Sequence, residues 1–300
     1  MAPMPFVQAL ERALDILEAF SPQNYELGIT DLSQRVNLSP PTVSRLVQTL
    51  VARGYLTQNP ENKKYRLSFK FLDFTAVIHA AMDLYQVSIP VLSRLRDKLK
   101  ETVYIDVMDG DERVCVISFP GIHAVRTVVP VGQRSPLYAG ADSRMLLASL
   151  EESEIEDYIE RVEFTVFTAN TITDKQELRE VIRKSREMDM SISVSEFHPG
   201  SACVSVPIRD YSAKVVGVLS VSFPDSRADL ETFHYYARAV RQAAADISAA
   251  MGFKGRAGPR DPSSLISYIE DYLRKGHELN GQAYLRSTND QAKNGAGYAK

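Results

Sequence analysis

The chain has 300 residues, of which 44% are hydrophobic, and a formal net charge of −3. That length and apolar content allow a sizeable core and suggest two domains rather than one. Cys115 and Cys203 are too far apart in sequence to form a disulfide framework or a metal-binding motif, and no apolar run approaches the ~18 residues needed to span a bilayer. We therefore expect a cytoplasmic, soluble protein from a reducing compartment, with no metal and no cofactor.

The first 68 residues have the pattern of a small helical domain. A first helix is predicted from Phe6 to Phe20, with an apolar side formed by Val7, Leu10, Leu14 and Leu17. Thr30–Val36 predicts a second helix, Asn37-Leu38-Ser39 a turn, and Pro40–Arg53 a third helix. Two helices joined by so short a turn are typical of a helix-turn-helix.

The third helix has two unlike faces. Its apolar face recurs at helical spacing, through Val43, Leu46, Val47, Leu50 and Val51. Its other face carries hydroxyl, amide and guanidinium groups that suit phosphates and base edges: Thr42, Ser44, Arg45, Gln48 and Thr49. Ser39 is placed to cap this helix, and Pro40 and Pro41 fall in its first turn.

A basic hairpin is predicted directly after the third helix. Tyr55–Gln58 and Lys63–Leu67 read as strands around a turn that contains Pro60. From Leu32 to Leu72 the chain has seven basic residues and one acidic residue. We therefore interpret the hairpin as a wing whose cations Lys63, Lys64 and Arg66 contact DNA phosphates.

Beyond residue 68 the composition changes. Phe69–Met82 predicts an apolar connecting helix, which we expect to pack on a second subunit. Between Ala76 and Phe253, 19 basic residues face 26 acidic ones, so this part is not expected to touch DNA. Its predicted helices are Val87–Lys100, Ala141–Leu150, Glu151–Val162, Asp174–Met188 and Asp229–Met251. Its predicted strands are Val103–Val107, Val114–Ile117, Arg126–Val131, Ile192–Ser195, Val204–Ile208 and Val215–Phe223, the first two flanking Asp109-Gly110 as a hairpin.

These elements predict an α+β fold, with an antiparallel sheet and helices to one side of it. The expected organisation is a winged helix-turn-helix DNA-binding domain (1–68), a connecting helix (69–84), an effector-binding and oligomerisation domain (85–253), and a linker and C-terminal tail (254–300). Within the tail, Ser263–Lys275 predicts a helix with Leu265, Ile269 and Tyr272 on one face.

In order and spacing, several motifs resemble the IclR family of bacterial transcription regulators from about Phe6 to Phe253. They are Ala9-Leu10-Glu11-Arg12-Ala13-Leu14, Ser39-Pro40-Pro41-Thr42-Val43-Ser44-Arg45-Leu46, Gly54-Tyr55-Leu56, Ser135-Pro136-Leu137-Tyr138-Ala139, Pro199-Gly200-Ser201-Ala202-Cys203 and Gly217-Val218-Leu219-Ser220. The resemblance implies a non-enzymatic regulator that binds operator DNA as a homodimer or homotetramer and a small organic effector in its second domain.

The resemblance also implies where an effector binds. The matching positions are Ala141, Asp142, Ser193, Cys203, Ser220 and Ser222. Many family members are similar in binding small carboxylic acids, but Asp142, Ser143 and Arg144 depart from the family pattern of a small residue, Gly and Lys. A cavity-facing Asp142 would disfavour an organic acid and favour a neutral amide, hydrazide or phenol, whereas an outward-facing Asp142 would cap the helix that begins there.

Residue patterns leave two other readings open. Alternation along the strand puts Ser220 and Ser222 on one side, where they need hydrogen-bond partners that a ligand or the neighbouring backbone could supply.

The second domain could instead only oligomerise. A thiol enzyme that uses Cys203 with His198 as its base is the remaining alternative, but Pro199-Gly200 between them predicts a turn that aims the two side chains independently.

Overall fold

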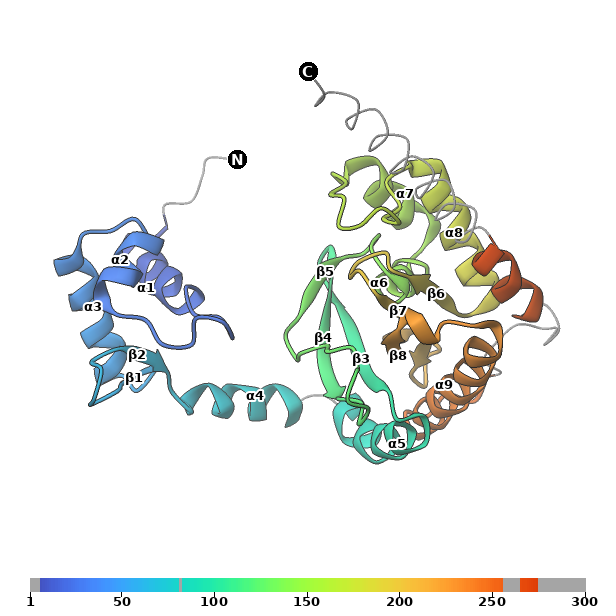
Figure 1. The fold of residues 1–300 in the computed structure, drawn as a ribbon, viewed down its shortest axis with the longest axis horizontal. Coiled ribbons are helices and arrows are strands. Elements are labelled where there is room, and N and C mark those ends of the chain that lie inside the picture. Colours follow the sequence, from blue (N-terminus) through green and yellow to red (C-terminus); the bar gives the residue numbers. More distant parts are fainter. Residues whose placement is uncertain (1–5, 81–82, 256–264, 275–300) are drawn as a thin grey trace, which may run out of the picture. The chain divides into compact units, whose positions relative to one another are not determined.

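The computed structural model describes residues 6–80, 83–255 and 265–274 (Figure 1). The chain divides into two compact units, residues 1–82 and residues 83–300, here called the first and second units. Each unit has its own buried core.

The first unit is a three-helix bundle followed by a hairpin and a further helix. Its elements are α1 (Gln8–Glu18), α2 (Ile29–Arg35), α3 (Pro40–Ala52), β1 (Leu56–Gln58), β2 (Tyr65–Leu67) and α4 (Lys70–Ala80). β1 and β2 pair antiparallel. The backbones of Leu27 and Tyr65 exchange two hydrogen bonds of 2.9 Å. The segment before α2 therefore forms an antiparallel bridge with β2 of the wing. This arrangement is the predicted winged helix-turn-helix.

The core of the first unit matches the predicted apolar face of α3, because Val43, Val47 and Leu50 are buried. The predicted apolar side of α1 is buried only in part, because Leu17 packs against the core but Val7, Leu10 and Leu14 do not. Leu10 and Leu14 remain 59% and 47% exposed, whereas Ile16 is fully buried. The three-helix core closes around the C-terminal half of α1, so the residues of its first turns have no partner within the unit.

The predicted cap of α3 is also wrong in detail. Ser39 occupies the position before the helix, but its side chain accepts no backbone N–H. Its hydroxyl lies 2.9 Å from that of Thr42 instead. With proline at both of the first two helical positions, two of the backbone donors that a cap would satisfy are missing.

The second unit is built on a six-stranded antiparallel sheet. The strands are β3 (Thr102–Asp109), β4 (Glu112–Phe119), β5 (Arg134–Pro136), β6 (Ser191–Val194), β7 (Ser201–Arg209) and β8 (Val215–Pro224). Their order across the sheet is β5-β4-β3-β8-β7-β6, so β6 and β5 are the edges. The hairpin between β3 and β4 is confirmed, with Gly110 in the left-handed conformation (φ +61°) that its tight turn requires.

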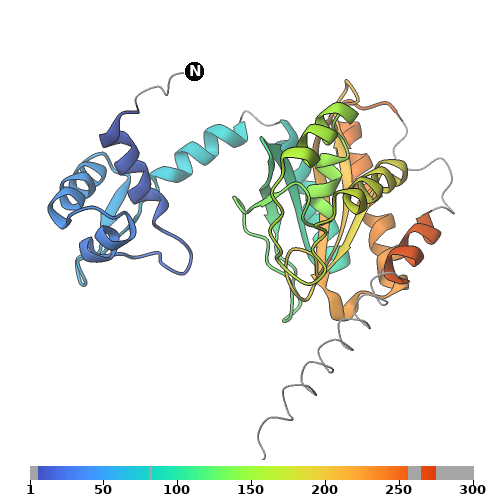
Figure 2. The ribbon, with the colours of Figure 1, turned by 90° about the horizontal axis from the view of Figure 1, so that it is seen from above.

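Helices cover both faces of this sheet, which corrects the prediction of helices to one side (Figure 2). α5 (Asp83–Leu99) and α9 (Leu230–Ala250) cover one face, where Phe233 of α9 meets Phe223 of β8 edge-to-face at 5.4 Å. α6 (Ala141–Leu147) covers the opposite face, and α7 (Glu152–Arg161) and α8 (Lys175–Met188) pack outside it. A short 3₁₀ helix, Asp225–Arg227, precedes α9.

One predicted strand does not form. Residues 126–131 are irregular, and the strand that pairs with β4 is Arg134–Pro136 further along the chain. Pro130 lacks the N–H that a ladder needs, and Val128 and Val131 are exposed. A prediction from β-branched composition alone therefore placed this strand too early in the chain.

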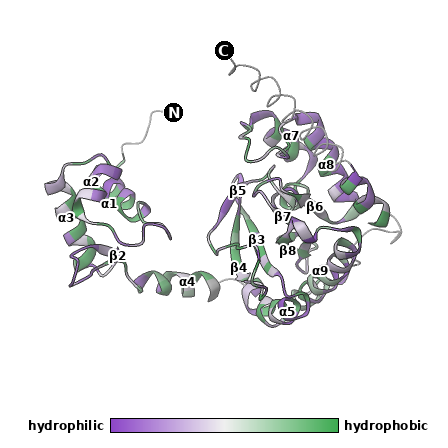
Figure 3. Cartoon of the chain, in the orientation of Figure 1, coloured by the Kyte–Doolittle hydropathy of each residue, from purple (hydrophilic) through white to green (hydrophobic). Residues whose placement is uncertain are grey.

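α4 carries its apolar residues on the surface of the first unit (Figure 3). Leu72, Phe74, Val77 and Ile78 are between 46% and 70% exposed. In the described part of the chain no single helix is long and apolar enough to cross a membrane, and α4 and α5 reach that length and composition only when taken together as a broken pair.

Candidate functional site

The polar face of α3 is open to solvent in the first unit. Arg45, Gln48 and Thr49 are exposed, and Thr42 and Ser44 are half-buried. The Gln48 side-chain amide lies 3.4 Å from the Ser44 hydroxyl, and the Thr49 hydroxyl donates to the Arg45 carbonyl. Among the described residues no buried contact holds the Arg45 guanidinium, so it is exposed for a partner.

The cations of the wing are also exposed. Lys63, Lys64 and Arg66 all lie on or beside the turn between β1 and β2. An open hollow of about 690 Å³ separates this turn from α2, with Arg35 and Lys64 among the residues that line it. The structure thus presents a polar helix face and a basic hairpin on one unit.

A residue that sequence reasoning missed holds the wing turn. The Glu26 carboxylate accepts hydrogen bonds from the side-chain amides of Asn59 (3.1 Å) and Asn62 (3.0 Å), and Arg66 lies 3.9 Å away. These hydrogen bonds, with the nearby cations, lower the pKa of Glu26 below its ordinary value. Its position 33 residues before Asn59 gave no sequence signal.

In the second unit, the predicted effector residues lie on one buried face of the sheet. Antiparallel register puts Cys203 opposite both Ser193 and Ser222, and Ser205 opposite Ser220. Side chains two positions apart share a face, so these five side chains point the same way. We call this surface the polar face. Ser220 and Ser222 are 0% and 5% exposed, and Val221 points to the opposite side, as predicted.

The first turn of α6 closes over the polar face. The Ala141 backbone N–H donates to the Ser193 hydroxyl at 3.1 Å, and Asp142 is 6% exposed. Gly140 before the helix has φ +93°, and a Cβ there would lie 2.9 Å from the Asp142 carboxylate. A side chain at position 140 would therefore push Asp142 out of place.

Asp142 points into the interior, as the first of the two alternatives expected, and the alternative in which it faces outward to cap α6 is wrong. Its Oδ2 accepts the Tyr104 hydroxyl at 2.9 Å and lies 3.4 Å from Arg113 Nε, and its Oδ1 accepts the Ser143 backbone N–H at 2.8 Å. Cys203 Sγ lies 3.2 Å from the same Tyr104 hydroxyl. The Tyr104 hydroxyl has one proton, which it donates to Asp142. In its contact with the Cys203 thiol, the hydroxyl oxygen is therefore the acceptor and the thiol is the donor.

Two carboxylates share one guanidinium below α6. Arg113 donates to Asp106 at 2.9 Å as well as lying beside Asp142, and all three side chains are buried. Burial raises the pKa of Asp106 to about 7, with Arg113 opposing the shift and Asp142 adding to it. We call Asp106, Arg113 and Asp142 the charged cluster. With both carboxylates ionised, the charged cluster carries a net −1.

Sequence reasoning missed Tyr104, Asp106 and Arg113. A signal was present, because Asp106 interrupts an otherwise apolar strand, Val103–Val107. An isolated acid at a buried strand position requires a partner. The identity of that partner, on the neighbouring strand, depended on a register with a bulge between Ile105 and Asp106.

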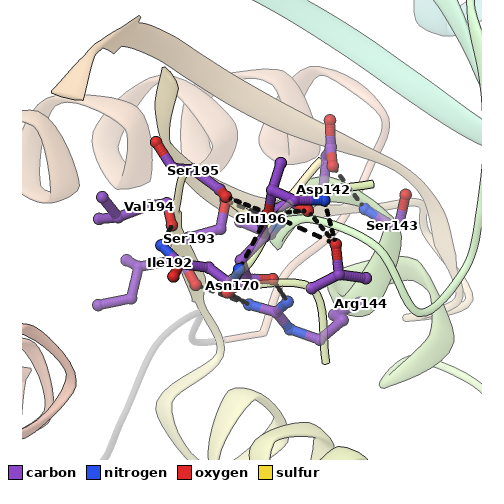
Figure 4. Close-up of polar contacts among 12 residues, drawn as sticks. Asp142, Ser143, Arg144, Asn170, Ile192, Ser193, Val194, Ser195 and Glu196 are labelled. Atoms are coloured by element: carbon purple, nitrogen blue, oxygen red, sulfur yellow. Dashed lines mark hydrogen bonds and ion pairs between the residues drawn. The ribbon is translucent and has the colours of Figure 1, made fainter. Parts of the chain in front are cut away.

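Arg144 anchors α6 to the edge of the sheet (Figure 4). It is fully buried, forms a two-pronged ion pair with Glu196, and donates to the Ile192 carbonyl at 2.8 Å. A bidentate pair with this geometry fixes the orientation of the guanidinium as well as its charge. Arg144 is thus bound to the protein itself and points away from Asp142.

The surroundings of Cys203 do not suit a nucleophile. Burial raises the pKa of the Cys203 thiol to about 12, with the nearby Asp142 acting in the same direction. Reactive cysteines need the opposite shift. His198 lies 2.8 Å from the Gln133 amide, and burial lowers its pKa. Among the described residues, no group of three or more histidine, cysteine or acidic side chains could hold a metal ion.

Comparison with known proteins identifies the family. Residues 9–60 match the IclR helix-turn-helix domain, and residues 76–249 match the bacterial transcriptional regulator IclR C-terminal domain. The chain belongs to the IclR family. It is a DNA-binding transcription regulator with an α+β fold.

Individual IclR proteins resemble the chain over nearly their whole length. The transcriptional regulator XynR of Escherichia coli is 33% identical over 250 residues, which are 83% of this chain and 99% of XynR. The crystal structure of a transcriptional regulator from Rhodococcus sp. RHA1 covers 82% of this chain and 98% of its own, with a TM-score of 0.74 and 28% identity. An IclR homolog from Microbacterium hydrocarbonoxydans, solved in complex with 4-hydroxybenzoate, shares the fold at 23% identity and a TM-score of 0.72, with 81% and 98% coverage. The similar curated proteins are named as regulators, in agreement with the expectation of a non-enzyme.

Proposed function

We propose that this IclR protein binds operator DNA as a homodimer, or as a homotetramer made from two dimers. Its recognition helix would read bases and phosphates through Ser39, Thr42, Ser44, Arg45, Gln48 and Thr49. The wing would contact phosphates through Lys63, Lys64 and Arg66. The exposure of both sets on one unit supports this assignment. One recognition helix reads few base pairs, and a two-fold pair can reach major grooves ~34 Å apart.

The apolar surfaces of the first unit support a second copy as the partner. The first turns of α1 and the length of α4 leave six large side chains between 46% and 70% exposed: Leu10, Leu14, Leu72, Phe74, Val77 and Ile78. A surface of this kind marks a protein interface. Sedimentation of Leu72→Glu/Val77→Glu should give a smaller species than wild type, and Lys214→Glu, at an exposed position before β8, is the control. An unchanged mass in the first variant would rule out α4 as the contact.

We further propose that the polar face under α6 binds a small organic effector through Ala141, Asp142, Ser193, Cys203, Ser220 and Ser222. The observation that carries this proposal is their convergence, from α6, β6, β7 and β8, on one buried surface that also holds a charged cluster. A buried layer of hydroxyl, thiol and carboxylate groups is costly in a core, and a ligand that bonds to it offsets that cost. The fold itself can hold a small molecule, since the Microbacterium homolog was solved with 4-hydroxybenzoate.

The charged cluster favours a neutral ligand that donates hydrogen bonds, such as an amide, hydrazide or phenol. Two carboxylates already compete for Arg113, so a third anion gains no unshared cation, and it meets a net negative charge once Asp106 ionises above its pKa of about 7. An organic acid would bind only by displacing Asp106 or Asp142 from Arg113. This alternative predicts that acid binding strengthens when one of the two carboxylates is removed.

Calorimetric titration distinguishes the two effector classes. We would titrate 4-hydroxybenzamide and 4-hydroxybenzoate into wild type and Asp142→Asn, with Asp157→Asn on the exposed face of α7 as the control. The proposal expects the amide to bind wild type more tightly than the acid, and the acid to gain from Asp142→Asn. Tighter binding of the acid to wild type would overturn the neutral-ligand assignment.

A second candidate is that the second unit only oligomerises. Hydrogen bonds within the polar face favour it, because Ser205 lies 2.8 Å from Ser220 and the Cys203 thiol reaches Tyr104, so these groups are satisfied without a ligand. Thermal shift against a panel of amides, phenols and organic acids separates the two candidates. Stabilisation of wild type that is lost in Ser220→Ala supports the effector site, and no shift with any compound supports oligomerisation alone.

A further inference from the structure

A C-terminal helix packs on the second unit beyond the residues that match the family. The family match ends at residue 249, and the alignment with XynR spans 99% of that protein but 83% of this chain. Residues 265–274 form a helix that lies outside the family match. It is therefore an addition to the common architecture.

The helix is docked by one apolar face. Leu265, Tyr268 and Ile269 are at most 9% exposed, whereas Ile266 is 47% exposed. Spacing at i, i+3, i+4 and i+7 extends the buried face to Tyr272, as the sequence predicted. A helix with one buried side and one exposed side is held in place by packing of its buried side on the second unit.

Tyr272 lies against the free edge of β6. Its hydroxyl accepts the Val194 backbone N–H at 3.2 Å and donates to a Glu196 carboxylate oxygen. β6 pairs with β7 on its other side only, so its outer edge presents unpaired backbone groups.

Side chains from distant segments satisfy the rest of that edge (Figure 4). Arg144 donates to the Ile192 carbonyl, and the Asn170 amide donates to the Val194 carbonyl at 3.1 Å. Tyr272 therefore completes a set of three side chains that cover the edge strand. It also contacts the carboxylate that pairs with Arg144, two positions along α6 from Asp142.

We propose that the helix 265–274 is an intramolecular latch, and that Tyr272 is a positioning residue which holds α6 through Glu196 and Arg144. Docking of the latch sets the position of Asp142 over the polar face. In this respect the inference rests on the proposed effector site and deepens it, because selectivity would depend on a segment outside the residues that match the family. The latch itself requires only the contacts described above.

Hydrogen–deuterium exchange of the full chain tests the latch without any ligand. In Tyr272→Phe, peptides that cover β6 and α6 should exchange at least roughly twofold faster, because the variant loses the two hydrogen bonds that the hydroxyl makes with Val194 and Glu196, while peptides of α9 stay unchanged. Tyr211→Phe, at an exposed tyrosine, is the matched control and should change neither. Faster exchange that is uniform over the second unit, with a lower Tm, would indicate a merely structural role and overturn the positioning assignment.

A chain that ends at Gly255 gives an independent measurement. It contains both stretches that match the family, residues 9–60 and 76–249, so it should fold. The proposal expects increased exchange at β6 and α6 beyond that of Tyr272→Phe, and unchanged exchange in both segments would overturn it. Failure of the amide and acid titrations in wild type would count against the effector site alone, since the exchange measurement uses no effector.

Discussion

The Asn62 side-chain amide donates a 3.0 Å hydrogen bond to Glu26, 36 positions earlier in the chain. Asn62 also accepts the Lys64 backbone N–H at 2.9 Å through its own carbonyl oxygen. Glu26 thereby connects the segment before α2 to the backbone of the wing turn. Glu26 therefore has two opposite effects on DNA binding. Its negative charge lies beside the cations that we expect to contact phosphates, whereas its hydrogen bonds hold the wing turn that carries those cations.

We predict that Glu26→Ala weakens operator binding. Electrostatics alone predicts the reverse, because removing a negative charge near phosphates strengthens binding. Loss of the two asparagine contacts frees the wing turn, so its cations lose their fixed positions. Gel-shift titration measures the change, and Glu61→Ala, which removes an exposed carboxylate from the same turn, should bind at least as tightly as wild type. Equal strengthening by both substitutions would leave Glu26 with no positioning role.

Arg45→Ala should weaken operator binding roughly 5- to 100-fold, the range that follows from ~1–3 kcal/mol for a good base contact. Arg45 projects from the exposed face of α3, and its removal leaves the buried face of Val43 and Val47 intact. Fluorescence anisotropy with the gene's own upstream DNA gives the affinity. Arg238→Ala, an exposed arginine on α9, should have no effect, and unchanged affinity of the α3 variant would show that another surface reads the operator.

Replacing Lys63, Lys64 and Arg66 together by alanine should reduce affinity for all DNA sequences alike. Long cations on a hairpin suit phosphates, and each lost phosphate contact should flatten the log-log salt dependence by about 0.9. Binding measured across a range of salt concentrations gives the slope directly. Lys98, Lys175 and Lys184 of the second unit provide a triple-alanine control, and identical slopes in the two variants would exclude phosphate contacts by the wing.

Stability should fall as pH rises from about 4 to 7, through the titration of Asp106. The pKa of Asp106 is about 7 in the folded chain against an ordinary value of 3.8, so between these values the folded state holds a proton that the unfolded state has lost. For one such group the free energy of unfolding decreases by at most about 1.4 kcal/mol per pH unit in this window.

Urea unfolding at pH 5 and pH 8 tests this dependence. Asp106→Asn cannot ionise and keeps a side chain of the same shape, so its two midpoints should lie closer together than those of wild type. Asp157→Asn is exposed on α7 and should retain the wild-type difference. A wild-type difference that persists in Asp106→Asn would assign the titration to another group.

The sequence predicted most elements because their periodicity is local. The apolar face of α3 needed only i, i+3 and i+4 spacing, and the common direction of Ser220 and Ser222 needed only strand alternation. The boundaries of α3, α8 and α9 fell within about two residues of prediction.

Features that depend on tertiary partners could not be predicted in this way. Burial of Ile16 instead of Leu10 depends on which part of α1 the other helices reach. The Arg113 partner of Asp142 lies 29 positions away on β4, beyond a bulge in the preceding strand that sequence patterns do not reveal. Prediction from Asp142 alone therefore missed both the cation beside it and the second carboxylate that shares that cation.

In the dimer proposed above, the exposed apolar residues of α1 and α4 would tie the stability of the first unit to protein concentration. Mass action stabilises any state that binds a second copy and leaves the unfolded chain untouched. For a dimer, a tenfold dilution then removes about 1.4 kcal/mol from the free energy of unfolding. Dilution would thus lower the occupancy of an operator twice, once by reducing the number of dimers and again by melting the helices that read the DNA.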